Sequence, residues 1–228
     1  MIKHETVVLS LGGSLVVPAR IDSGYLKKFR RMVIGLVSRG YRFIIVTGGG
    51  DTARQYQRGA RAAGVRLEAD LDWIGIAATK INAELVRAVF GPAAHHTVVI
   101  DPTKRLKTSK KIIIGSGWRP GCSSDKDAVL LARTYGANRV INMSNIPYVY
   151  TADPRADRTA RPLRQMSWDQ LFAITGRRWR PGAHVPFDPE AAKLAQIHGI
   201  RVIVCAGSQL ANISNIIRMR SYRGTTIA

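Results

Sequence analysis

Two glycine-rich turns are the first residues of this sequence whose types and spacing could do chemistry. Gly12-Gly13-Ser14 follows an apolar, strand-like run, and Gly48-Gly49-Gly50 repeats the arrangement after a second run. Glycine permits positive φ and lets backbone N–H groups point at an anion, so such turns can hold phosphate. The second turn opens a predicted helix, whose dipole adds to the attraction, and Arg54 stands one turn into it. One such turn is a weak signal; two at consecutive strand ends favour a phosphate site.

Several familiar nucleotide and hydrolase motifs are missing from the sequence. It contains no G-x-x-x-x-G-K-[ST] string, which argues against a P-loop kinase, and no G-x-G-x-x-G at the first helix. No nucleophile elbow or Ser/His/Asp arrangement is evident. His95-His96 is the single histidine pair, and adjacent residues do not share a face, so we expect no metal site there. The phosphate chemistry must therefore belong to another fold.

Strand-like apolar runs alternate with segments of helical periodicity along the chain. We predict strands at residues 7–11, 42–47, 97–100, 111–114, 139–142, 202–205 and 225–227. We predict helices at 22–39, 51–63, 71–90, 124–136, 189–198 and about 208–218, with a short one opened by a capping box at Ser167. Residues 151–165 show no periodicity. This alternation predicts an α/β fold with a mainly parallel central sheet and helices on both faces.

Length and composition describe the class of protein. The 228 residues are enough for one large α/β domain, and 46% hydrophobic with 22% charged residues is typical of a globular protein. The apolar runs are strand-length, well short of the roughly 20 residues that cross a bilayer. The first residues run straight into a strand with no signal peptide, and Cys122 and Cys205 lack metal spacing. We therefore expect a reduced, cytoplasmic protein without a membrane partner.

The net charge of +20 is the most unusual bulk property of the chain. It is consistent with attraction of polyanionic small substrates or with nucleic-acid binding. Lys and Arg are spread from Lys3 to Arg223, with no block of like charge longer than three residues. We therefore expect substrate attraction rather than a nucleic-acid partner, although composition alone leaves the second interpretation open.

An ordered series of short strings resembles the amino-acid-kinase family, and within it the archaeal-type UMP kinases. The resemblance runs from Ser10 to Ile227, and the order and spacing of the strings carry it. The strings are Ser10-Leu11-Gly12-Gly13-Ser14, Gly48-Gly49-Gly50-x-x-Ala53-Arg54, Asp72-x-x-Gly75-Ile76, Pro120-Gly121-Cys122-Ser123-Ser124-Asp125, Asn145-x-x-x-Val149-Tyr150-x-x-Asp153-Pro154, Phe187-Asp188-Pro189-x-Ala191-Ala192-Lys193 and Gly224-Thr225-Thr226-Ile227.

The resemblance implies an αβα sandwich of the amino-acid-kinase fold, formed by a single domain over residues 1–228. It also implies two lobes, an acceptor-binding one at about 1–115 and an ATP-binding one at about 116–228. The implied reaction is transfer of the γ-phosphoryl group of ATP to UMP, with Mg²⁺ bridging the nucleotide phosphates and no dedicated metal-ligand set on the protein. The family further suggests a homo-oligomer, specifically a hexamer.

Site residues follow from the resemblance, position by position. The residues implied at the transfer centre are Gly12, Gly13, Ser14 and Asp188. Those implied for UMP are Gly49, Gly50, Arg54, Asp72, Ser123, Ser124 and Asp125, with Asp72 accepting from the ribose. Those implied for ATP are Ser10, Asn145, Tyr150, Asp153 and Pro154. Phosphoryl transfer needs alignment of two anionic nucleotides and compensation of their charge more than covalent help.

The chain departs from the common pattern at several positions. Many members of the wider family carry lysine at the position of Ser10, and Lys193 is a candidate replacement cation. Pro147-Tyr148 stands where the common pattern has Asp-Gly; proline removes a backbone donor and fixes φ, so we expect the ATP-side loop to differ locally. Trp118 replaces a residue that is usually small. Trp179 and His184 stand in a loop that is usually rich in Gly and Ser.

Two other functions remain compatible with the sequence. A kinase of the same fold could act on another acceptor, such as another nucleoside monophosphate, an isoprenoid phosphate or a carboxylate; Arg54 and Asp72 favour a ribonucleotide. Alternatively, the chain could be a non-catalytic nucleotide- or oxyanion-binding protein or a nucleic-acid-binding regulator, which Ser10 and the net charge keep open.

Overall fold

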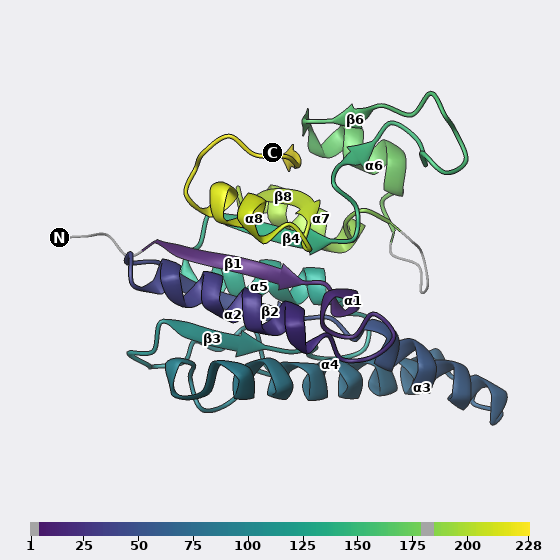
Figure 1. Cartoon of the computed structure of the whole chain (residues 1–228). Helices are drawn as coiled ribbons and strands as arrows, with labels where there is room; N and C mark the ends of the chain where they lie inside the picture. The colour runs from purple at the N-terminus through teal and green to yellow at the C-terminus, as the bar shows by residue number, and fades with distance from the viewer. Residues whose placement is uncertain (1–4, 179–184) are drawn as a thin grey trace.

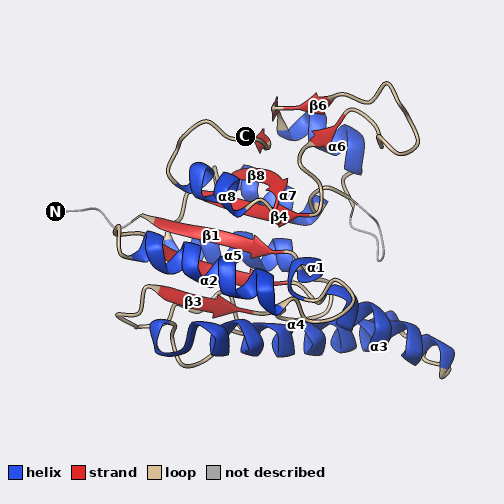
Figure 2. Ribbon diagram, in the orientation of Figure 1, coloured by secondary structure: helices blue, strands red, loops and turns tan. Residues whose placement is uncertain are grey.

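A mainly parallel β-sheet forms the centre of the molecule. The computed structural model describes residues 5–178 and 185–228, and within them seven strands follow the order β3-β2-β1-β4-β8-β9-β7 (Figures 1 and 2). The β8–β9 pair is antiparallel, and the other neighbours are parallel. The strands are β1 Thr6–Leu11, β2 Arg42–Thr47, β3 Ile112–Gly115, β4 Arg139–Ser144, β7 Gln165–Met166, β8 Arg201–Ala206 and β9 Thr225–Ile227.

Helices cover both faces of this sheet. On one face α2 (Ser23–Val37), α4 (Glu68–Phe90) and α8 (Leu210–Ile217) pack against Val7 and Leu9 of β1. On the other face α5 (Ser124–Tyr135), α6 (Trp168–Thr175) and α7 (Pro189–Ile197) pack against Val8. Because the central strands are buried on both sides, most of their residues are apolar, as is typical of parallel sheets. The predicted fold class is confirmed.

Four helices begin near the carboxyl ends of the parallel strands. The short α1 (Gly13–Val16) and α3 (Gly50–Ala62) follow β1 and β2. Ser123 and Asp188 cap the first turns of α5 and α7 with their side chains. Such caps satisfy backbone N–H groups that have no partner within the helix. This edge of the sheet therefore gathers helix N-termini, which favour anions.

The predicted strand at 97–100 was wrong. The structure has two isolated bridges there, Ala94 with Ile112 and Val99 with Gly115. The chain advances from Ala94 to Val99 while its partner advances only from Ile112 to Gly115, so the segment cannot keep a strand register.

The aperiodic segment 151–165 is also more ordered than expected. It contributes β6 (Pro162–Leu163), which pairs with β5 (Val149–Tyr150) in a small antiparallel sheet. The predicted capping box at Ser167 is confirmed, since its hydroxyl accepts from Gln170 N and Gln170 accepts from Ser167 N. Trp179 and His184 lie outside the described residues.

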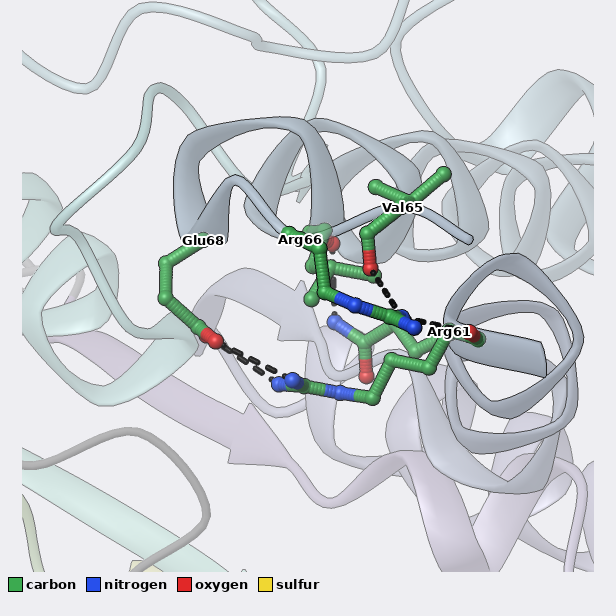
Figure 3. A network of polar contacts seen from close by, with 6 residues as sticks. Arg61, Val65, Arg66 and Glu68 are labelled. Carbon is green, nitrogen blue, oxygen red and sulfur yellow. Dashed lines mark hydrogen bonds and ion pairs between the residues drawn. The ribbon is translucent and has the colours of Figure 1, made fainter. Parts of the chain in front are cut away.

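In the helical hairpin α3–α4, α4 runs along the bottom of Figure 1 and α3 extends to the lower right; α3 has no buried residue. Arg61 donates to both carboxylate oxygens of Glu68 at 3.1 Å, and Arg66 donates to the Arg61 carbonyl at 2.9 Å (Figure 3). Gln57 Nε2 donates to Leu71 O at 2.9 Å. The hairpin is thus held by polar contacts between its helices. Among the described residues no helix has the length and apolar character needed to cross a bilayer.

Candidate active site

The two glycine turns meet backbone to backbone at the carboxyl edge of the sheet. A Cβ atom at Gly13 would overlap the backbone nitrogen of Gly50, and one at Gly50 would overlap the Gly13 carbonyl. Gly50 also has a φ of +62°, which L side chains rarely adopt. Gly12 N–H donates to Met143 O at 3.1 Å, which ties the first turn to β4. Glycine is therefore required here for close approach, and the turns predicted to hold phosphate form one unit.

A cavity of about 190 Å³ opens beside this unit. Its walls come from the start of α3, the first turns of α4 and the segment that joins β3 to α5. The lining residues are Gly49, Ala53, Gln57, Asp72, Gly75, Ile76, Thr79, Gly117, Arg119, Cys122, Ser123 and Ser124. The cavity thus combines a helix N-terminus, one carboxylate and several hydroxyl groups, which is the equipment expected for a phosphorylated polyol.

Side chains of α4 fix the floor and wall of the cavity. Asn82, 3% exposed, donates to the carbonyls of Gly48 and Gly49 at 2.9 and 3.0 Å. Thr79 Oγ1 accepts from Gly117 N–H at 2.8 Å. Sequence reasoning missed Asn82 and Thr79, because their only signal is a polar side chain within an apolar helix pattern.

The segment 116–123, which we call the β3–α5 loop, is held by carboxylates at two further points. Asp72 Oδ2 accepts from Gly121 N–H at 3.1 Å. Asp127 Oδ2 accepts from Trp118 N–H at 3.2 Å, and Asp127 is fully buried. Its other oxygen has no hydrogen-bond partner among the described residues. Asp127 therefore anchors the loop from inside the core, a role that the sequence analysis did not identify.

A second cluster of carboxylates, formed by Asp125 and Asp188, lies where the two halves of the sheet meet. Asp125 Oδ1 accepts from Ser10 Oγ at 3.0 Å and from Asn142 Nδ2 at 3.0 Å. Asp188, 4% exposed, accepts from Ser123 Oγ with Oδ2 and from Glu190 N–H at 2.7 Å with Oδ1. The structure thus brings Ser10, Asp125, Ser123 and Asp188 together, although they are distant in the sequence.

Comparison with known proteins decides the family. The model of the amino acid kinase family matches residues 5–206. The chain belongs to the amino acid kinase family. It is 35% identical over 225 residues to a uridylate kinase of Methanocorpusculum labreanum, covering 97% of this chain and 94% of that protein. A uridylate kinase of Pyrococcus abyssi is 32% identical, with 97% and 98% covered.

A solved structure agrees with this membership. The crystal structure of uridylate kinase from Archaeoglobus fulgidus matches this chain with a TM-score of 0.83 and 33% identity. The match covers 97% of this chain and 99% of that one. The predicted amino-acid-kinase fold is therefore confirmed over nearly the whole chain.

Two buried carboxyl groups near the glycine unit, those of Asp125 and Asp127, have raised pKa values. Burial, with a contribution from the charge of Asp188, raises the pKa of Asp125 to about 6. Burial likewise raises the pKa of Asp127 to about 7. Among the described residues no ion pair joins Asp125, Asp127 or Asp188 to Lys or Arg. Lys193, the candidate cation, pairs with Glu190 at 2.9 Å. The centre therefore carries acidic groups without a fixed counter-cation.

The remaining predicted residues lie less close to the cavity. Arg54 is exposed and directs Nε toward Asp51 Oδ1 at 3.4 Å, so it does not line the cavity. Ser14 lies exposed in α1. Ser14 directly follows Gly13 in the chain, and Arg54 stands one helical turn after Gly50. To bind a phosphate at the glycine turns, the Arg54 guanidinium would have to leave its exposed i,i+3 ion pair with Asp51.

Of the residues expected to bind ATP, Ser10 is buried in β1, and the other four lie along the segment after β4. Asn145 is exposed, and Tyr150 lies in β5 with its ring 6.5 Å from that of Tyr148. Asp153 is exposed and paired with Arg155 at 3.0 Å, and the hydrogen bond from Arg155 lowers the pKa of Asp153. Pro154 follows it, also exposed. The contacts of these residues are thus local ones within the segment that follows β4.

Proposed function

We propose that this protein is a uridylate kinase that transfers the γ-phosphoryl group of ATP to UMP, giving UDP and ADP. One observation carries the proposal. A cavity with a helix N-terminus and a carboxylate lies beside two glycine turns that approach each other too closely for either to carry a side chain. Uridylate kinases similar over 97% of the chain support the same activity.

The cavity suits the acceptor nucleotide from its phosphate to its base. We propose that Gly49 and Gly50 bind the UMP phosphate with N–H groups at the start of α3, helped by Arg54. Asp72 accepts from the ribose hydroxyls. Ser123 and Ser124, which line the cavity, complete the site toward the base. Asp125 lies behind these serines and fixes their helix, because it is bound to Ser10 and Asn142.

The transfer centre lies between the glycine unit and the two carboxylates. We propose that Gly12, Gly13 and Ser14 bind the transferring phosphoryl group with backbone N–H groups and a hydroxyl, which offset charge in the transition state. Asp188 orients the centre through Ser123 and the first turn of α7. The reaction then depends on alignment of the two nucleotides rather than on a protein nucleophile.

Magnesium fits this centre as the partner of the ATP phosphates. Carboxylate oxygens of Asp125 and Asp188 are hard donors of the kind that Mg²⁺ prefers, directly or through water. Within the part of the chain that the structure describes, no group of three or more His, Cys, Asp or Glu residues forms a metal site. We therefore propose that Mg²⁺ is bound mainly by nucleotide phosphates, whose charge it offsets.

We propose that ATP binds along the opposite half of the sheet. Asn145, Tyr150, Asp153 and Pro154 would line its base and ribose, and Ser10 would lie near the transferring phosphate. Residues of about 1–115 would form the acceptor-binding lobe and about 116–228 the ATP-binding lobe, with Ser123 and Ser124 reaching the acceptor cavity from the second lobe. A cytoplasmic location and a homo-oligomer, a hexamer by family resemblance, complete the proposal. Free thiols at Cys122 and Cys205 are consistent with a reducing compartment.

An acceptor screen tests the proposed function. Purified protein with ATP and Mg²⁺ is given UMP, CMP, AMP or GMP in turn, and ADP release is followed with a coupled enzyme assay. We expect UMP to give the highest kcat/KM and UDP as the product. Absence of ADP with UMP, in protein that is folded by circular dichroism and binds nucleotide, would overturn it.

A further inference from the structure

One face of α3 forms a wall of the cavity beside the glycine unit. Gly49, Ala53 and Gln57 all line this cavity. They stand four residues apart, so they follow one another along a single face of the helix. Gln57 therefore supplies the polar side chain at the end of this wall that is farther from the glycine turn.

The Gln57 amide bridges α3 to the start of α4. Its Nε2 donates to the carbonyl of Leu71 at 2.9 Å, and Leu71 directly precedes Asp72 in α4. The amide also lies against Gly75, because a Cβ atom at that position would be 2.8 Å from Gln57 Nε2 and would displace it. The contact thus depends on both helices: an amide on α3 and a glycine on α4.

Asp72, next to this contact, connects α4 to the opposite wall of the cavity. Its Oδ2 accepts from Gly121 N–H of the β3–α5 loop at 3.1 Å. Because α3 has no buried residue, polar contacts rather than core packing fix it against α4. The Arg61–Glu68 pair is one such contact, but neither of its residues lines the cavity. The Gln57 contact, by contrast, lies in the cavity wall beside Asp72.

We propose that Gln57 is a positioning residue that holds Asp72 in place for the ribose of the acceptor. Its hydrogen bond fixes the backbone of the turn from which the Asp72 side chain projects, and Gly75 leaves the room that the amide needs. A carboxylate that is fixed before binding loses less conformational entropy when hydroxyl groups engage it. The inference rests on the proposed function, in which Asp72 is the ribose partner, and adds a residue that acts on the substrate through Asp72.

A double-mutant cycle tests whether Gln57 acts through Asp72. Gln57→Met keeps the length of the side chain and removes the donor. We expect the Kd for UMP, measured by calorimetry, and the KM for UMP to rise roughly 3- to 10-fold, while kcat and the KM for ATP stay unchanged. Asp72→Asn removes the charge but keeps an acceptor for Gly121 N–H. In that background Gln57→Met should cost less than about two-fold, because residues that act as a unit are not additive.

Arg61→Met is the matched control, because Arg61 also bridges α3 to α4, through Glu68, but away from the cavity (Figure 3). It should leave the Kd and KM for UMP within about two-fold of the wild type. Equal losses in Gln57→Met and Arg61→Met would overturn the inference, because any loosening of the hairpin would then have the same effect. Additive losses in the cycle of Gln57 and Asp72 would overturn it as well.

The position of Asp72 can also be followed without a nucleotide. Exchange of the Gly121 amide hydrogen, measured by NMR, reports the hydrogen bond that this amide donates to Asp72. We expect faster exchange in Gln57→Met and an unchanged rate in Arg61→Met; an unchanged rate in Gln57→Met would contradict the inference. If the wild type phosphorylates no UMP, the proposed function fails, while the binding cycle and the exchange at Gly121 still decide whether Gln57 holds Asp72.

Discussion

The proposed acceptor side and the proposed donor side of this molecule are built in different ways. The proposed acceptor cavity is bordered by backbone that buried polar side chains hold in place: Asn82 binds the carbonyls of Gly48 and Gly49, and Asp127 binds Trp118 N–H. The donor segment carries exposed residues whose contacts are local, as in the Asp153–Arg155 pair. Buried anchors hold one geometry, whereas exposed ion pairs contribute little and adapt easily. The proposed acceptor site is therefore held more firmly than the proposed donor segment, whose contacts are local.

The largest expected effect is at the centre that the two sides share. Asp188→Asn should lower kcat on the order of 100-fold while UMP affinity, measured by calorimetry, stays within a few-fold of the wild type. Asparagine is as good an N-cap as aspartate, so α7 should persist and only the charge is lost. The matched control is Asp22→Asn, which changes the cap of α2. Turnover that survives in Asp188→Asn would contradict its assignment.

An effect on stability rather than on turnover is expected at Asp127, the buried residue that anchors the β3–α5 loop. The pKa of Asp127 is raised from 3.8 to about 7, mainly by burial; Asp125 and Asp188 add to the rise, and Lys126 and the Trp118 N–H oppose it. Between these values the folded state keeps a proton that the unfolded state releases, so stability falls as pH rises through this window. At roughly 1.4 kcal/mol per pKa unit, the loss is on the order of 4 kcal/mol by pH 8.

Asp127→Asn removes this titration but keeps an acceptor for Trp118 N–H. The free energy of unfolding of the variant, relative to the wild type, should therefore be greater at pH 8 than at pH 5, as measured by urea titration at both values. Asp70→Asn, which changes an exposed carboxylate of α4, serves as the control. A difference between variant and wild type that does not change with pH would show that Asp127 is not a buried acid of this kind.

The smallest effect is expected on the donor side. Asp153→Asn should raise KM for ATP only several-fold, because its carboxylate is exposed and already engaged by Arg155. The KM for UMP should not change. Steady-state kinetics with each nucleotide varied in turn separates the two. A loss as large as that of Asp188→Asn would break the contrast between the two sides and indicate that the donor site is equally preformed.

The sequence predicted those parts of the site that depend on local backbone chemistry. The residues next to them in the chain are enough to predict that glycines after a strand form a turn and that an aspartate before Pro189 caps a helix. The structure places Asp188 as an N-cap beside Ser123. Asn82, Thr79 and Asp127 could not be found in this way. Each acts on the backbone of a residue from another element or loop, such as Asn82 on Gly48, and only the tertiary fold brings them together.

The fold followed from the alternation of strands and helices, and its one clear error is also instructive. Residues 97–100 have the β-branched, apolar character of a strand, but Val99 is the only one of them that forms a bridge. Strand character is necessary for pairing and does not guarantee a matching register. The Arg119 guanidinium lies over the ring of Trp118. This contact also has no sequence signature, because the side chains of neighbouring residues usually point apart.

The contact between Gly13 and Gly50 limits which mutations this gene can tolerate. Every single-base change in a glycine codon that yields another amino acid adds a Cβ atom. At Gly13 that atom meets the second turn, and at Gly50 it meets the first. A change in either codon cannot be offset by substituting the other, because the opposing atoms belong to the main chain. Both codons are therefore expected to go on encoding glycine, because each position needs the other to lack a side chain, although the two lie far apart in the sequence.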